Sequence, residues 1–359
     1  MEKSLKHIFM KINRLFLALG LCVALYSCDN SSKDDIKPVG SGTLVLNNGN
    51  WGGNDSNIGI YTPSTKTLSP NAFYSANGQK LGDLGQDIIA MGDDIYIAVN
   101  GSQTIFVTDN ELKIQAQINA DKDGARLSPR YFATSGSKVY VTYYEGYVGE
   151  ISSKDSVRLC AVGPNPECIA VAGNNLYVAN SGGMAYPAYN NTVSVVSTSS
   201  FTETSTIKVN VNPAKVEASS DGSFVYVSSL GNYADAPAKL QVISVATGTV
   251  ADLEYTSVSA IAKGRNDVLY ILCGGYDESW NPLPGTVYKH DMKTNTALGA
   301  FVMDGTTLPE ACSVSAGRDG YVYVGCSDYK NTGDVYVFTP DGVLYDKFDS
   351  QGLNPIKVF

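Results

Sequence analysis

The chain has 359 residues, of which 43% are hydrophobic and only 17% are charged. This composition is too apolar for a disordered chain, and the length suits one large domain or two ordinary ones. A formal net charge of −9 argues against a nucleic-acid backbone as partner, and two histidines disfavour most zinc sites and catalytic triads. The 35 glycines and 23 tyrosines favour many short strands and turns over long helices.

The first 27 residues have the pattern of a secretion signal. Lys11 and Arg14 precede an apolar run from Leu15 to Leu25, which is too short to span a bilayer. The run ends in Leu-Tyr-Ser followed by Cys28, which resembles a bacterial lipobox. The resemblance implies that residues 1–27 are a lipoprotein signal peptide and that Cys28 carries the lipid. A plain membrane anchor that happens to end in cysteine is the alternative.

A short polar segment follows Cys28. Residues 28–41 begin with Asp-Asn-Ser-Ser-Lys-Asp-Asp after the cysteine, so we expect a flexible acidic tether. The lysine with two acidic residues resembles the surface-export signal of lipoproteins in Bacteroides-like bacteria. That resemblance implies an outer-membrane lipoprotein exposed at the cell surface, whereas an ordinary tether would explain the same composition.

From residue 42 onward the sequence repeats. A triplet of an apolar residue, tyrosine and an apolar residue follows a tight-turn cluster in six places, centred on Tyr96, Tyr140, Tyr177, Tyr226, Tyr270 and Tyr323. Short apolar strands flank most triplets, which gives four strands in roughly 45 residues, the period of a β-propeller blade. The triplet tyrosines are interpreted as packing residues. Two packed β-sandwiches are the alternative, but they would not predict a repeated triplet.

The two ends of this repeating region supply a seventh blade. Residues 356–359 resemble an innermost strand without a following partner, and residues 43–46 resemble a second strand without a preceding one. Joined with residues 58–61 and 68–73, they predict one composite blade that closes the ring and removes open sheet edges. The prediction is an all-β, seven-bladed propeller over residues 42–359, because eight blades would need another repeat and six would leave the ends unexplained.

Long loops follow the second strands of the predicted blades. Connections after the second strand and those entering the next blade emerge on one side of a propeller, and long loops on one side of a rigid scaffold usually carry function. Aromatic rings with polar tips suit a flat or ring-shaped ligand, and amides can bind hydroxyls and amides. The predicted ligand-binding residues are Asn50, Trp51, Tyr144, Tyr186, Tyr189, Tyr233, Tyr276, Trp280 and Tyr329.

Catalytic residues are poorly represented. After removal of the signal, His290 is the only histidine, and we expect it on a third strand in a packing role. Loop carboxylates such as Glu167, Asp277 and Glu278 allow a calcium site only in principle, because no spacing singles out a ligand set. Cys312 and Cys326 flank one hairpin, where a disulfide or two buried thiols are both possible. The expectation is a protein with no catalytic residue, metal site or cofactor.

Several stretches resemble the YncE-like seven-bladed propeller lipoproteins of Bacteroides-like bacteria, the surface layer protein group. The most specific is residues 73–83, Phe-Tyr-Ser-Ala-Asn-Gly-Gln-Lys-Leu-Gly-Asp; others are residues 45–50, 128–131, 274–278 and 328–359. The BtuG-type members capture cobalamin at the cell surface above the TonB-dependent transporter BtuB. The resemblance therefore implies a cobamide ligand and a BtuB-like partner, with the outer membrane contacted through Cys28.

Three hypotheses remain at this point. The first is a non-enzymatic lipoprotein that captures a cobamide on its long-loop face and passes it to the transporter. The second is a glycan- or peptide-binding propeller of the same layout. The third is a calcium-dependent hydrolase of the lactonase kind.

Overall fold

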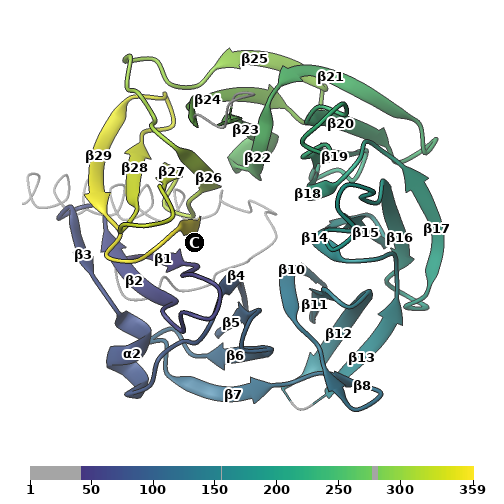
Figure 1. Ribbon diagram of the computed structural model, residues 1–359, viewed down its shortest axis with the longest axis horizontal. Helices are drawn as coiled ribbons and strands as arrows, with labels where there is room; N and C mark the ends of the chain where they lie inside the picture. Colours follow the sequence, from purple (N-terminus) through teal and green to yellow (C-terminus); the bar gives the residue numbers. More distant parts are fainter. Residues whose placement is uncertain (1–41, 155, 277–281) are drawn as a thin grey trace, which may run out of the picture. The chain divides into compact units, whose positions relative to one another are not determined.

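The six apolar–tyrosine–apolar triplets all form β-strands in the structure, a computed structural model that describes residues 42–359 apart from 155 and 277–281. Their alternating pattern places each tyrosine in the interior, where none is more than 8% exposed. Each triplet is the second strand, counted from the centre, of a four-stranded antiparallel blade (Figure 1). Their role as packing residues is confirmed.

Seven such blades surround a central channel, so the predicted all-β, seven-bladed propeller is confirmed (Figure 1). Three consecutive blades follow the composite blade, and their strands from the innermost outwards are β4 (Gly85–Met91), β5 (Asp94–Val99), β6 (Thr104–Thr108) and β7 (Ile114–Ile118); β10 (Pro129–Ser135), β11 (Lys138–Tyr143), β12 (Tyr147–Ser153) and β13 (Ser156–Ala161); and β14 (Pro166–Ala172), β15 (Asn175–Asn180), β16 (Thr192–Ser197) and β17 (Glu203–Lys208).

Three further blades complete the series, and their strands in the same order are β18 (Pro213–Ala218), β19 (Phe224–Ser229), β20 (Lys239–Ser244) and β21 (Val250–Thr256); β22 (Val258–Lys263), β23 (Val268–Tyr276), β24 (Pro282–Asp291) and β25 (Thr296–Ala300); and β26 (Ala311–Ala316), β27 (Val322–Cys326), β28 (Asp334–Phe338) and β29 (Leu344–Asp349). A short 3₁₀ turn, Arg265–Asp267, precedes β23.

The composite blade closes the ring as the sequence predicts. Its strands, from the centre outwards, are β30 (Pro355–Val358), β1 (Thr43–Asn47), β2 (Asn57–Thr62) and β3 (Thr67–Ser69). Leu44 and Phe359 exchange two backbone hydrogen bonds of 2.8 and 2.9 Å. Val45 pairs with Val358, and both side chains are buried. The closure therefore combines strand pairing with apolar packing between segments far apart in the sequence.

One part of the composite blade differs from the prediction. The outer strand expected over residues 68–73 ends at Ser69, and residues 72–77 form the helix α2 (Ala72–Asn77). Asn71 and Gly78 flank the helix in left-handed conformations, and Phe73 packs its ring into the apolar interior. The pattern of Leu68 and Phe73 fits a strand equally well, and only the turn chemistry of Asn71 and Gly78 indicates the helix.

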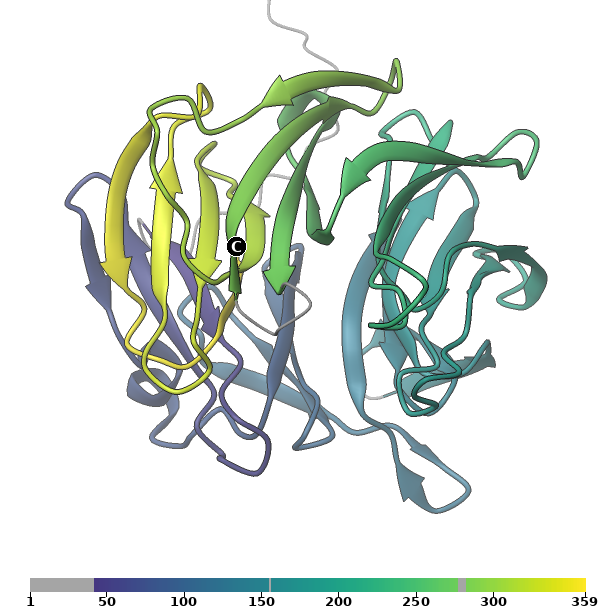
Figure 2. The same cartoon turned by 45° about the horizontal axis from the view of Figure 1, so that its top comes forward.

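The connections have very different lengths on the two faces of the ring. Turns between first and second strands and between third and fourth strands are short, for example residues 92–93 and 245–249. The connections on the other face include residues 181–191, 230–238 and 301–310, the helix α2, and a hairpin of β8 (Asp121–Lys122) and β9 (Ala125–Arg126). The hairpin projects from the lower right of Figure 2, and the loop after β1 lies along the same edge. No helix in the described part is long and apolar enough to cross a membrane.

Candidate functional site on the long-loop face

A repeated hydrogen bond positions the loops of this face. In six blades, the backbone N–H of the first residue after the second strand bonds to the carbonyl of the residue just before the innermost strand; in the blade of β22–β25 the equivalent donor is Gly274, within β23. The bond joins Asn48 to Asn354, Asn100 to Leu84, Tyr144 to Ser128, Ser181 to Asn165, Leu230 to Asn212, Gly274 to Ser257 and Ser327 to Glu310, at 2.8–3.1 Å. The loops that carry the predicted aromatic residues therefore start from equivalent, fixed points.

Each innermost strand also has a register shift at its long-loop end. One or two extra residues lie there, as in a β-bulge, which re-aims side chains at a defined place. Arg130 and Glu167 occupy these positions on β10 and β14, and Gln86 does so on β4. In six of the seven blades, the residue that directly precedes the innermost strand has a positive φ. These residues are Leu84, Asn165, Asn212, Ser257, Glu310 and Asn354.

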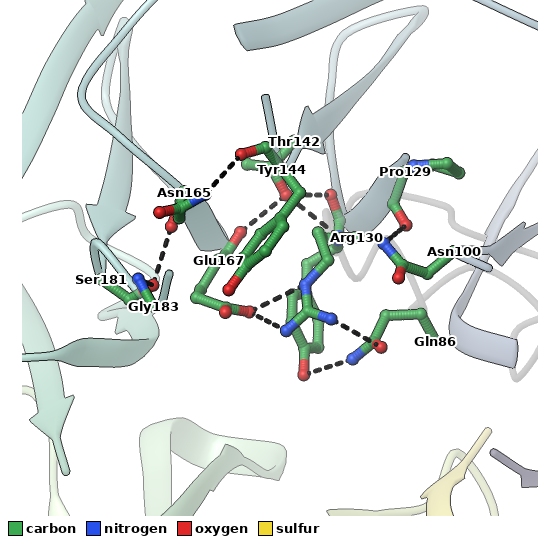
Figure 3. Close-up of polar contacts among 11 residues, drawn as sticks. Gln86, Asn100, Pro129, Arg130, Thr142, Tyr144, Asn165, Glu167, Ser181 and Gly183 are labelled. Atoms are coloured by element: carbon green, nitrogen blue, oxygen red, sulfur yellow. Dashed lines mark hydrogen bonds and ion pairs between the residues drawn. The ribbon is translucent and has the colours of Figure 1, made fainter. Parts of the chain in front are cut away.

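Arg130, Glu167 and Gln86 form a polar network at the mouth of the channel (Figure 3). The Nε of Arg130 donates to Glu167 at 2.9 Å, and Nη2 donates to the same carboxylate oxygen. Nη1 donates to Gln86 Oε1 at 3.1 Å, while Gln86 Nε2 donates to the hydroxyl of Tyr131 at 2.8 Å. Burial lowers the pKa of Arg130, but Glu167, Tyr131 and Tyr144 together raise it by more, so the guanidinium stays charged.

Four predicted residues form a tyrosine cluster beside this network: Tyr144, Tyr186, Tyr189 and Tyr233. The Tyr144 ring lies 5.0 Å from the Arg130 guanidinium, and its hydroxyl lies so close to Gly183 that a Cβ there would collide with it. Gly183 belongs to the loop that carries Tyr186 and Tyr189, whose rings meet edge to face at 5.9 Å. The Tyr189 ring lies 6.2 Å from that of Tyr233.

The cluster offers ring area and hydroxyls to a ligand. Tyr186 and Tyr233 are 67% and 55% exposed, far more than tyrosines that serve only packing. Burial raises the pKa of Tyr144, Glu167 raises it further, and Arg130 opposes the shift, so the phenol stays neutral at physiological pH. A neutral phenol can both donate and accept a hydrogen bond.

The loop of Trp51 lies on the composite blade and is held by carboxylates. Asp83 accepts from the N–H of Gly52 at 3.1 Å, and Asp55 accepts from the N–H of Asn50 at 2.9 Å. Asn50 is exposed and Trp51 is 83% exposed, so these bonds fix the backbone while the indole faces solvent.

Tyr329 lies on the neighbouring blade and is linked to the Trp51 loop through Asn354. The amide nitrogen of Asn354 donates to the carbonyl of Gly49 at 3.0 Å, and its oxygen accepts from Ser327 Oγ at 2.6 Å. That same hydroxyl oxygen accepts from the N–H of Tyr329 at 3.0 Å. Tyr329 is 52% exposed, so a second group of exposed aromatics, Trp51 and Tyr329, stands on two adjacent blades.

The remaining predictions fall partly outside the described residues. Trp280, the side chain of Tyr276, Asp277, Glu278 and Cys28 all lie there. Tyr143, which directly precedes Tyr144 and ends β11, is 1% exposed and packs in the core. His290 lies on the third strand β24, as expected, and is 2% exposed, with hydrogen bonds to Tyr255 and Asn295.

The five cysteines in the described part of the chain are free thiols. Cys326 pairs across the hairpin with Ala311, not with Cys312, because the register shift on β26 turns Cys312 toward the channel. Burial raises the pKa of each of these two thiols to about 12. In the described part of the chain, no group of three or more His, Cys, Asp or Glu side chains could hold a metal ion.

The central channel beneath the network was not singled out by the sequence. It is a cavity of about 430 Å³ that extends from Asn48 and Gln86 at the mouth to Arg318 and Phe359. Its wall carries Asp87, Lys215, Glu217, Lys263 and Lys357. The usable signal is positional, because Lys215 and Lys357 each lie two residues after the proline of an Asn-Pro pair at the start of an innermost strand.

No family model matches the chain, and no curated protein sequence matches it. Solved structures do match. A candidate 6-phosphogluconolactonase from Bacteroides fragilis aligns with a TM-score of 0.61 at 16% identity, over 92% of this chain and all of that one. A candidate 6-phosphogluconolactonase from Bacteroides uniformis aligns at 0.57 and 14%, over 88% and 99% of the two chains. Hydrazine synthase from Kuenenia stuttgartiensis aligns at 0.55 and 18%, over 70% and 74%. These similarities show the propeller fold.

Proposed function

We propose that the protein is a ligand-capture propeller, and that its ligand, a cobamide, binds across the long-loop face. The observation that carries the binding part is the tyrosine cluster at the channel mouth. The rings of Tyr186 and Tyr233 are exposed, the half-buried Tyr189 ring meets both of them edge to face, and Tyr144 adjoins the charged network of Arg130 and Glu167. Exposed aromatics that border a polar concavity are typical of a small-molecule site.

The cobamide part rests on the resemblance of residues 73–83 and 45–50 to the YncE-like propeller lipoproteins, whose BtuG-type members capture cobalamin. A cobamide is a broad ring with peripheral amides, and the exposed hydroxyls and amides around the mouth suit such groups. The proposal includes lipidation at Cys28, display at the outer membrane and transfer of the ligand to a BtuB-like TonB-dependent transporter.

Calorimetry with purified residues 42–359, which form the closed ring, tests the proposal. Titration with cyanocobalamin should give a single site with a dissociation constant below about 1 μM. A Tyr186→Ala and Tyr189→Ala double variant should lose most of that affinity, whereas Tyr74→Ala, an exposed tyrosine on α2, should not. Absence of cyanocobalamin binding to the folded wild type would refute the cobamide assignment.

Two other functions compete on specific grounds. A glycan- or peptide-binding propeller would use the same exposed aromatics, and a glycan array separates it from a cobamide binder. A lactone hydrolase is suggested by the solved structures named as candidate 6-phosphogluconolactonases. Lactone hydrolysis by the purified protein, abolished by EDTA in the calcium-dependent version, would support that function over ligand capture.

A further inference from the structure

Lys215 differs from the other charged residues of the channel wall. It follows the register shift on β18, so its side chain enters the central cavity. Its ammonium lies 3.7 Å from the ring centroid of Tyr131. Burial lowers the pKa of Lys215, but Tyr131, Cys168 and Asp87 raise it by more, so the ammonium is charged at neutral pH.

Three other cations of the channel and its mouth have carboxylate partners. Lys357 Nζ lies 3.3 Å from Asp87, and Lys263 Nζ lies 3.1 Å from Asp267. Arg130 is held by Glu167 at the mouth. Among the described residues, no carboxylate oxygen comes within 4.0 Å of Lys215 Nζ. A cation away from bulk water without such a partner is costly to maintain, so its retention needs an explanation.

Lys215 is also connected to the candidate site. Tyr131 lies under its ammonium and accepts a hydrogen bond from Gln86, which in turn accepts from Arg130. The Arg130 guanidinium faces the Tyr144 ring of the tyrosine cluster. A continuous chain of contacts therefore links the tyrosine cluster to Lys215, and its inner members Gln86, Tyr131 and Lys215 line the cavity of about 430 Å³.

Two innermost strands that follow β18 around the ring carry small residues at their long-loop ends. At the positions equivalent to Arg130 and Glu167, β22 and β26 carry the small, uncharged residues Ser259 and Cys312. Cys312 is part of the cavity lining, and the charged residues Lys263 and Lys357 lie further along the wall. A group that enters past Ser259 and Cys312 therefore meets small, uncharged side chains before Lys215.

We infer that the channel is an oxyanion site, in which a phosphate or carboxylate group of the bound ligand pairs with Lys215. Entry of the whole ligand from the long-loop face rests on the proposed function, but the anion site itself does not. An ammonium without a carboxylate gains a charge-assisted hydrogen bond from such a group at little further desolvation cost.

Inorganic phosphate and acetate are the probes that test the site directly. Titrated into residues 42–359 and followed by NMR, one or both should bind at a single site in the millimolar range. The variant Lys215→Met should weaken that binding by about 10-fold or more, which is the expected loss of one charge-assisted bond. Lys208→Met, which removes an exposed lysine on β17, is the matched control and should leave the binding unchanged.

Failure of both probes to bind the wild type, or equal binding to Lys215→Met and Lys208→Met, would overturn the inference. A thermal melt of each variant establishes that it is folded. Should Lys215→Met not fold, Lys215→Gln replaces it, and Lys215→Arg should retain the anion because it keeps the charge.

A pair of larger probes separates this inference from the proposed function. Cyanocobalamin contains a phosphodiester, whereas dicyanocobinamide keeps the corrin ring without the phosphate and nucleotide. If both bind and Lys215→Met weakens only cyanocobalamin, inference and function both stand. If neither binds but phosphate binding still depends on Lys215, the cobamide function fails and the oxyanion site stands. If cyanocobalamin binds equally to wild type and Lys215→Met while phosphate and acetate do not bind, only the oxyanion site fails.

Discussion

Arg130 faces the ring of Tyr144 at 5.0 Å while Glu167, on the next blade, holds two of its nitrogens. The side chains of this ion pair are only 19% and 12% exposed. A single arginine therefore couples the packing between two blades to the position of a tyrosine in the candidate site. The predictions below begin from this contact.

Glu167→Gln should lower the free energy of unfolding by about 3 kcal/mol, because it leaves the largely buried Arg130 guanidinium without its counter-charge. Urea denaturation measures the change. Asp123→Asn breaks the exposed Lys122–Asp123 pair and should cost less than about 1 kcal/mol. Equal effects of the two substitutions would mean that the buried pair contributes no more than a surface pair.

Trp51→Ala should weaken ligand binding by about 10-fold and leave stability unchanged, since loss of a stacked ring costs about 1–3 kcal/mol and the side chain is 83% exposed. Calorimetry with cyanocobalamin measures the affinity. Tyr74→Ala, which removes another exposed ring, serves as the control. An unchanged affinity in Trp51→Ala would remove the Trp51 loop from the site.

Asp83→Ala should loosen the Trp51 loop, because its carboxylate accepts the N–H of Gly52 with both oxygens. In a Trp280→Phe background, Trp51 is the single tryptophan, so its fluorescence anisotropy reports the loop alone. The anisotropy should fall, and affinity should fall several-fold with little change in melting temperature. A large loss of stability would instead assign Asp83 a structural role.

Protonation of His290 should destabilise the fold. Burial lowers its pKa below the ordinary value, although Asn295 and Asp291 oppose the shift. The unfolded chain therefore takes up a proton at a higher pH than the folded one, so the stabilising contribution is present above the unfolded pKa of about 6.5 and is lost as the pH falls through it. The melting temperature should drop between pH 7.5 and about 5.5, and His290→Gln should flatten that dependence.

Gly325→Ala should destabilise the ring closure, because a Cβ at Gly325 would collide with the carbonyl oxygen of Pro355 on β30. The expected loss is about 1–3 kcal/mol of unfolding free energy, typical of overpacking. At Gly274, an added Cβ would lie 3.4 Å from its nearest neighbouring atom, so Gly274→Ala is the matched control. Similar urea midpoints for the two variants would contradict this account.

The architecture was predictable because it repeats. Each tyrosine triplet follows a turn cluster, and strand alternation buries every such tyrosine. The helix α2 was not predictable in the same way, because Phe73 fits the spacing of a strand as well as that of a helix. Its flanking Asn71 and Gly78 were the only local indication.

The candidate site was predictable only in part. Aromatic residues in long loops identified Tyr186, Tyr189 and Tyr233, because loop composition is a local property. Arg130 and Glu167 are 37 residues apart and meet only because they occupy equivalent bulge positions on adjacent blades. Predicting their contact requires the register of two strands, which the sequence pattern specifies to within a residue or two at best.

The composite blade has a further consequence for how the molecule folds. Its inner pair joins Val45 to Val358, so more than three hundred residues must be in place before these strands can meet. Closing so long a loop loses conformational entropy before the contacts of the closed blade can form. The pairing of these two strands is therefore expected to be slow. The final event in assembly should therefore be the meeting of β1 and β30, and amide hydrogens there should gain protection from exchange after those of the other blades.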